Sequence, residues 1–190
     1  MGRKFLDQII SGAGVVLAVA FLLLGSAAIF GGQFGQENVR DRLEPQNITF
    51  PPAEAMTPEE KDIVGEYAGE KVDTGPEAEA FSRYIGLHLA EVNEGKTYSE
   101  TSSEARALEE DDPARAELDG KVMTLFRGET LRGLLLNAYG WWVASTIALY
   151  AGIGLVIGGI ILAVFAALGF RHAKKVAEGT KTRAAKPVTA

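Results

Sequence analysis

Residues 133–170 read GLLLNAYGWWVASTIALYAGIGLVIGGIILAVFAALGF, which is 38 consecutive positions without Asp, Glu, Lys or Arg. An α-helix needs only about 20 apolar residues to cross the roughly 30 Å hydrocarbon core of a bilayer. The run is therefore long enough for one membrane crossing and a helical stalk outside it. Tyr139, Trp141 and Trp142 form an aromatic cluster of the kind that settles at the headgroup level, which predicts that the outer edge of the span lies near Trp142.

A second apolar stretch lies near the start of the chain, from Ile9 to Phe30. Arg3 and Lys4 in front of it, and the small residues Ser26-Ala27-Ala28 within it, would also fit a cleaved signal peptide. The apolar core of a signal peptide is about 7–15 residues long, and this stretch is longer. An uncleaved transmembrane helix is therefore the favoured interpretation.

Charge is unevenly distributed along the 190 residues. Residues 1–31 hold two bases and one acid (+1), residues 32–170 hold 11 bases and 23 acids (−12), and residues 171–190 hold six bases and one acid (+5), which gives the overall −6. Because Lys and Arg accumulate in cytoplasmic segments, both termini are predicted to be cytoplasmic and the acidic segment to lie outside. Acidity also excludes nucleic acid as the partner of that segment. The basic tail either contacts anionic lipids or only fixes the topology.

These features predict an all-α membrane protein, with two transmembrane helices flanking a small helical extracytoplasmic domain and the second span continuous with an external stalk helix. A domain of about 80 residues is small for a self-sufficient core, so we expect it to need the stalk or a partner. Caps followed by apolar spacings of three and four mark its helices. They are expected from the capping box Thr57-Pro58-Glu59-Glu60 to about Gly69, from about Pro76 to Gly95, from Tyr98 to Leu108 with Thr101 and Glu104 as a capping pair, and from Asp112-Pro113 into the second span.

The predicted boundaries follow from these signals. They are a cytoplasmic N-terminus (1–8), transmembrane helix 1 (9–31), an extended external linker (32–56), the helical extracytoplasmic domain and stalk (57–140), transmembrane helix 2 (141–170) and a basic cytoplasmic tail (171–190).

Small residues indicate where the predicted spans could meet other helices. Gly14 and Ala18 are four residues apart in the first span, and Gly154 and Gly158 form a GxxxG in the second, with Ala151 one turn earlier. Such faces allow backbones to approach closely in lipid. We expect these faces to pair either with each other or with another protein.

The sequence predicts no catalytic, cofactor-binding or metal site. Without cysteine, thiol catalysis and cysteine-ligated metals are excluded. The predicted topology separates the two histidines, His88 and His172, so they cannot share a metal site. His88 falls on the apolar side of its predicted helix and is interpreted as a packed core residue.

Three charged residues of the stalk are the remaining candidates for a contact site. Arg127 and Arg132 could hold lipid phosphates or the acids of a partner. Alternatively, Glu129 forms an ordinary surface pair with Arg132, three residues further on.

Several segments resemble a family of uncharacterised two-span membrane proteins of actinobacteria, over most of residues 5–170. The resemblance implies two spans around an external segment and carries no established activity. Some similar sequences bear an aromatic-ring-opening dioxygenase label, which would require an iron site that two separated histidines do not supply. The matching segments are Tyr67-Ala-Gly-Glu-Lys-Val72, Gly95-Lys-Thr-Tyr98-Ser99, Asp112-Pro113 and the stalk Phe126-Arg-Gly-Glu-Thr-Leu-Arg132.

We therefore expect a non-enzymatic accessory or scaffold subunit of the cell membrane, in contact with lipids and with other membrane proteins or its own copies. The alternative is an extracytoplasmic ligand or envelope-stress sensor. A third hypothesis, a lipid-acting enzyme, rests only on Arg127, Glu129 and Arg132.

Overall fold

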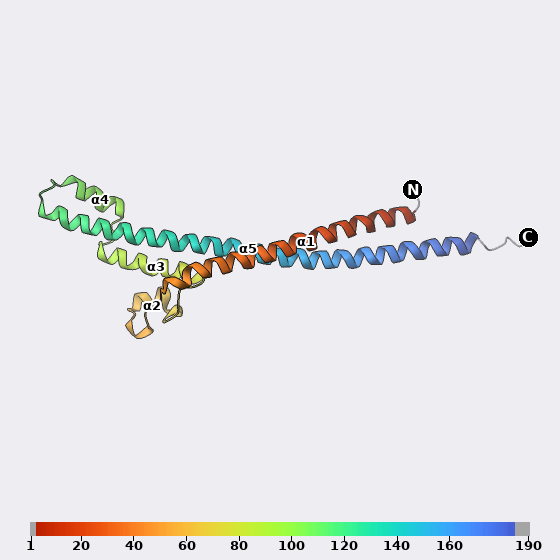
Figure 1. The fold of residues 1–190 in the computed structure, drawn as a ribbon, viewed down its shortest axis with the longest axis horizontal. Coiled ribbons are helices and arrows are strands. Elements are labelled where there is room, and N and C mark those ends of the chain that lie inside the picture. Colours follow the sequence, from red (N-terminus) through yellow and green to blue (C-terminus); the bar gives the residue numbers. More distant parts are fainter. Residues whose placement is uncertain (1–2, 185–190) are drawn as a thin grey trace, which may run out of the picture. The chain divides into compact units, whose positions relative to one another are not determined.

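The computed structural model describes the backbone of residues 3–184 and the side chains of residues 5–175, so the ends of both predicted cytoplasmic segments lie outside the described residues. The described part is helical and contains no strand (Figure 1). Two helices, of 41 and 72 residues, are long and apolar enough to cross a membrane by length and composition. The elements are α1 (Arg3–Leu43), η1 (Glu44–Gln46), η2 (Ala53–Ala55), α2 (Pro58–Val64), η3 (Gly65–Tyr67), α3 (Gly75–Val92), α4 (Tyr98–Ala107) and α5 (Pro113–Ala184).

The chain divides into two compact units, which are described separately. The hairpin unit comprises residues 1–33 and 146–190, and the central unit comprises Phe34–Ser145. The hairpin unit holds the first part of α1 and the last part of α5, which run antiparallel. Gly14 faces Ala166 at one level, and Gly25 faces Gly152 at another.

The first long helix extends further than the sequence predicted. α1 continues to Leu43, so the predicted extended linker 32–56 is wrong for residues 32–43. Glycines in this stretch suggested a break, because glycine weakens a helix. In the structure Gly35 instead lies against Ser145, where an added Cβ would collide with the serine side chain. Val39 and Leu43 are buried, and this burial holds the last turns of α1 in the helix.

The hydrophobic core of the central unit draws on both long helices. Val39 and Leu43 come from α1 and Leu135 comes from α5. The stalk residue Leu135 thus contributes to this core, and the need of the domain for the stalk or a partner stays a prediction. The other buried members are Phe50, Met56, Val64, Val72, Ala78 and Ala80.

The segment before α2 is anchored by backbone pairing and by aromatic contacts. The Phe50 N–H donates to Glu70 O at 2.9 Å, and the Val72 N–H donates to Ile48 O at the same distance. The Phe50 ring stacks on Tyr67 and meets Phe81 edge-on, with centroids 5.4 and 5.1 Å apart. These contacts fix a segment that has little regular structure of its own.

Helix caps are mostly those that the sequence indicates. Thr57 and Glu60 form the predicted capping box of α2, although α2 ends at Val64 and continues only as the 3-10 helix η3. α3 ends as predicted before Gly95, which has φ +76°. α5 starts at the predicted Asp112-Pro113 and continues without interruption through the second apolar stretch.

The predicted capping pair of α4 is wrong. Thr97 and Glu100 form the capping box, not Thr101 and Glu104. Thr101 is fully buried and Glu104 pairs with Lys96, so both are engaged elsewhere. Two Thr-x-x-Glu patterns four residues apart cannot be distinguished by pattern alone.

Candidate functional site

One close contact of the hairpin unit joins two glycines. A Cβ added to Gly25 would lie 2.8 Å from Gly152 O, and one added to Gly152 would lie 2.7 Å from Gly25 O. Gly159 faces Ala18 and Leu22 in the same way, since a Cβ added to Gly159 would lie 3.1 Å from Ala18 O. Side chains larger than hydrogen are therefore excluded at the two facing glycines.

Buried small residues repeat every seventh position along this contact. A seven-residue repeat keeps one face of each helix toward its partner as the two helices wind around each other with a left-handed twist. The repeating positions are Ser11, Ala18, Gly25 and Gly32 in α1, and Gly152, Gly159, Ala166 and Ala173 in α5.

Of the five residues predicted to pack helices, only some lie in this contact. Ala18 is 2% exposed, and a Cβ on Gly14 would lie 3.3 Å from that of Ala166. In α5 the predicted face is displaced, because a Cβ on Gly154 would meet none of the described atoms within 4 Å and Ala151 is exposed. Gly158 lies at the edge, where an added Cβ would be 3.6 Å from Phe21 Cδ2. The four-residue spacing of Gly154 and Gly158 pointed to a neighbouring face of α5. The contact of α5 with α1 instead follows the seven-residue repeat.

The three predicted interfacial aromatics differ in their surroundings. Trp141 is 64% exposed, as expected of a headgroup anchor. Trp142 instead packs against the core of the central unit, with its Cβ and Cγ directly over Gly75. Tyr139 is half-buried. Consequently only Trp141 presents a freely exposed ring.

Arg132 is a structural link between α3 and α5. Its Nε donates to Ser82 O at 3.1 Å, and its Nη1 donates to both carboxylate oxygens of Glu129 at 2.8 and 3.1 Å. Gly86 makes room for the guanidinium, since a Cβ there would lie 3.0 Å from Arg132 Cζ. Arg127, by contrast, is exposed. The two arginines therefore differ in their surroundings, since Arg132 is bonded within the fold and Arg127 is exposed.

His88 connects α3 to α2 and is not the core residue that its position suggested. Its side chain is 43% exposed, and its Nε2 lies 3.2 Å from Glu60 Oε1. Its Nδ1 lies 3.0 Å from Tyr84 O. Both ring nitrogens thus lie within hydrogen-bonding distance of an oxygen atom.

Glu60 is the buried partner of this group. The N–H of Thr57, with smaller contributions from the Thr57 hydroxyl, His88 and the Tyr84 hydroxyl, holds the pKa of the Glu60 carboxyl below its ordinary value despite desolvation. Desolvation, followed by the Glu60 charge, raises the pKa of Tyr84. Glu60 is therefore an ionised hydrogen-bond acceptor, in keeping with its role as a helix cap.

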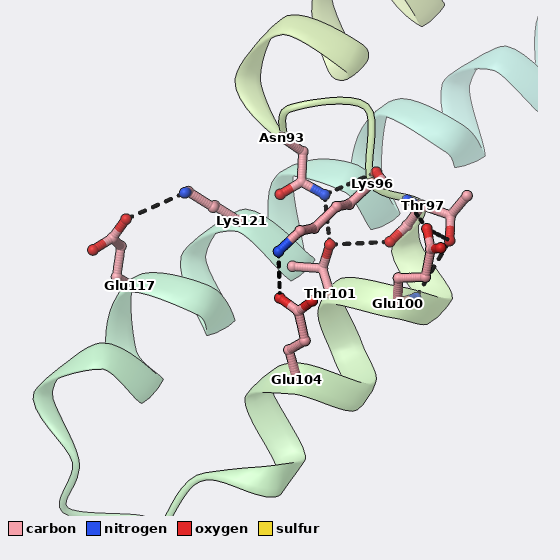
Figure 2. A network of polar contacts seen from close by, with 8 residues as sticks. All are labelled: Asn93, Lys96, Thr97, Glu100, Thr101, Glu104, Glu117 and Lys121. Carbon is pink, nitrogen blue, oxygen red and sulfur yellow. Dashed lines mark hydrogen bonds and ion pairs between the residues drawn. The ribbon is translucent and has the colours of Figure 1, made fainter.

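A polar network surrounds the loop between α3 and α4 (Figure 2). Asn93 is buried and its Nδ2 donates to Lys96 O at 2.8 Å and to Thr101 Oγ1 at 2.5 Å. Lys96 Nζ lies 2.8 Å from Glu104 Oε2, and this bond raises the pKa of Lys96. The Thr97 N–H lowers the pKa of Glu100. This network fixes one wall of a cleft.

The cleft has a volume of about 470 Å³ and lies between α3, α4 and α5. Its lining is mainly apolar, from Leu89, Ala90, Leu125 and Tyr98. Its basic side chains, Lys96 and Arg132, are already paired with carboxylates. The cleft could hold a small apolar group, but it presents no set of groups arranged for acid, base or nucleophilic chemistry.

No cluster of three or more His, Cys, Asp or Glu residues that could hold a metal ion occurs in the part of the chain that the structure describes. In the hairpin unit His172 Nδ1 lies 3.1 Å from Asp7 Oδ2, which joins α5 to α1. Comparison with family models, with curated proteins and with solved structures finds no match. The resemblance to two-span actinobacterial proteins thus stays a prediction.

Proposed function

We propose that this chain is an integral membrane protein whose α1 and α5 cross the bilayer as a hairpin, and that it acts as a non-enzymatic accessory or scaffold subunit. The observation that supports membrane insertion most directly is the outward face of the hairpin unit. Its large apolar side chains point away from the helix contact, and this contact is made largely of small residues. The exposed side chains include Val16, Leu23, Leu24 and Phe30 in α1, and Ile147, Tyr150, Ile157 and Phe165 in α5, each more than half exposed.

Lipid is the covering that fits this surface. Soluble proteins rarely expose an apolar patch of more than a few hundred Å². Uninterrupted helices also satisfy their own backbone hydrogen bonds, as a membrane span requires. Arg171, Lys174 and Lys175 follow Phe170, and this supports a cytoplasmic location for that end of α5. The central unit would then be extracytoplasmic.

The accessory role is supported by a second face of α5, on which two small residues lie next to an isoleucine. Ile147, Ala151 and Gly154 are spaced by four and three residues, and all are exposed. They lie on a different side of the helix from Gly152, which contacts α1. Backbones approach closely at such a face in lipid, so it is suited to a transmembrane helix of another protein.

Site-specific photo-crosslinking in native membranes tests this role. A photoreactive amino acid at Ala151 should give discrete protein adducts that mass spectrometry can identify. The matched control is Ile160, which is 52% exposed but lies on the opposite side of α5. It should give mainly lipid adducts. If both positions react only with lipid, the accessory role is wrong, although membrane insertion would stand.

The cleft of the central unit favours one alternative, a sensor of a small apolar ligand. This ligand would enter next to Leu89 and Leu125, and Ala90→Trp should close the cleft without altering the core. A phenotype of Ala90→Trp equal to deletion of the whole protein would support the sensor. The lipid-acting enzyme is less well supported, because Arg132 is engaged by Ser82 and Glu129.

A further inference from the structure

One face of α5 in the central unit carries large apolar side chains that stay more than half exposed. Phe126 is 54% exposed, although one side of its ring meets Tyr98 of α4 with centroids 6.2 Å apart, and Leu134 is 64% exposed. Phe126, Thr130, Gly133, Asn137 and Gly140 are spaced alternately by four and three residues, and all five are exposed. We call these five residues the stalk face, which Leu134 borders on one side and Leu136 on the other. The opposite side of α5 is already in use, since Leu135 lies in the core.

The stalk face differs from the exposed surface of the hairpin unit in what would cover it. In the proposed topology the span begins near Trp141, so the stalk face lies mostly outside the hydrocarbon. Exposed Phe and Leu side chains in water favour burial against protein, at roughly 25 cal/mol per Å² of apolar area. A protein partner is thus a better covering than lipid.

We propose that the stalk face binds the same face of a second copy of this chain, forming a parallel two-fold pair; this inference rests on the proposed membrane insertion. All copies in one membrane share one orientation, so their α5 helices are parallel. A two-fold axis then places each residue of the stalk face opposite itself. The alternating spacing is that of a left-handed helix pair.

The residues of the stalk face suit pairing with themselves. Gly133 and Gly140 each offer open space, since a Cβ on either would meet none of the described atoms within 4 Å. The five spaced positions include no acid or base, so two copies would not bring like charges together there. The Thr130 hydroxyl is already bonded to Phe126 O at 2.7 Å and needs no further partner.

Asn137 is the residue that favours a second copy over an unrelated protein. Its amide both donates and accepts hydrogen bonds, so two Asn137 side chains facing each other across a two-fold axis satisfy one another. A single asparagine at such a position in a parallel helix pair fixes the register and the number of helices. An unrelated partner would have to supply a matching polar group at the same level.

Cysteine crosslinking of the full chain in native membranes tests the pair, since the chain has no cysteine of its own. Asn137→Cys should form a disulfide-linked dimer under mild oxidation. The matched control is Leu136→Cys, which is also exposed but points about 100° away around the helix. We expect a several-fold higher dimer yield at position 137 than at position 136.

Equal yields at the two positions, or no dimer at position 137, would overturn the pair. The photo-crosslinker at Ala151 tests the proposed function separately from the self-pairing. Adducts with other proteins at Ala151, together with no dimer at position 137, would leave the accessory role standing and remove only the self-pairing. A dimer at position 137 without foreign adducts at Ala151 would support the pair and contradict the accessory role.

Discussion

Gly25 and Gly152 face each other with so little space that a Cβ on either would lie under 3 Å from the backbone oxygen of the other. Replacement of Gly152 by alanine must therefore separate α1 from α5 locally. Overpacking of this kind costs typically about 1–3 kcal/mol. We expect Gly152→Ala to lower the thermal stability of the detergent-solubilised protein, measured by helix content on heating.

Gly154→Ala is the matched control for this change, because it adds the same methyl group two residues away in open space. Its effect should stay within about 0.5 kcal/mol of the parent protein. Equal destabilisation by both changes would mean that the glycine contact does not hold the hairpin together.

Arg132 and Arg127 should respond differently to truncation. Arg132→Ala removes the bond to Ser82 O and leaves Glu129 without its cation, so we expect a loss of about 1–3 kcal/mol in unfolding free energy. Arg127→Ala should change stability by less than about 0.5 kcal/mol. Denaturant titration of both variants measures the difference. A larger loss for Arg127→Ala than for Arg132→Ala would contradict the assignment of Arg132 as the link between α3 and α5.

Because of Glu60, the stability of the central unit should depend on pH in the acidic range. Its pKa is lower in the folded protein than the ordinary value of 4.5, so the folded state binds fewer protons than the unfolded state as the pH falls through this range. The stabilisation is fully present above pH 4.5 and is lost as the pH falls through the folded-state pKa. Glu60→Gln should flatten this part of the pH profile of the melting temperature. Glu59→Gln, at an exposed neighbour, should leave the profile unchanged.

Membrane topology can be tested with single cysteines, again because none is present in the chain. In the proposed arrangement Asp73→Cys and Glu109→Cys react with a membrane-impermeant maleimide in intact cells, and Ala184→Cys reacts only after lysis. Labelling of Ala184→Cys from outside would mean that the hairpin is inverted or does not form. A mature N-terminus after Ala28 would show instead that the first apolar stretch is a cleaved signal.

Local chemistry in the sequence predicted the helix starts well. Thr57 with Glu60, and Asp112 with Pro113, mark their helices because a cap depends on residues only a few positions apart. The end of α1 was not predictable in this way. Gly32 and Gly35 look like helix breakers, and only the buried positions of Val39 and Leu43 show why the helix continues.

The candidate site was predicted less well, because it depends on contacts between distant segments. Gly14 and Ala18 were identified, but the facing residues Gly152 and Gly159 were missed. The seven-residue repeat of small residues was the available signal, and the GxxxG pattern at Gly154 obscured it. Likewise, nothing local indicates that Trp142 packs over Gly75 while Trp141 stays exposed.

The participation of α1 and α5 in the core of the central unit has a practical consequence for recombinant work. A soluble fragment cut at the predicted domain limits, 57–140, would lack Val39, Leu43, Phe50 and Met56, and these are four of the nine buried apolar residues in that core. A fragment spanning 34–145 keeps all nine. The boundaries for expression should therefore be set by the core and not by the point at which the sequence becomes polar.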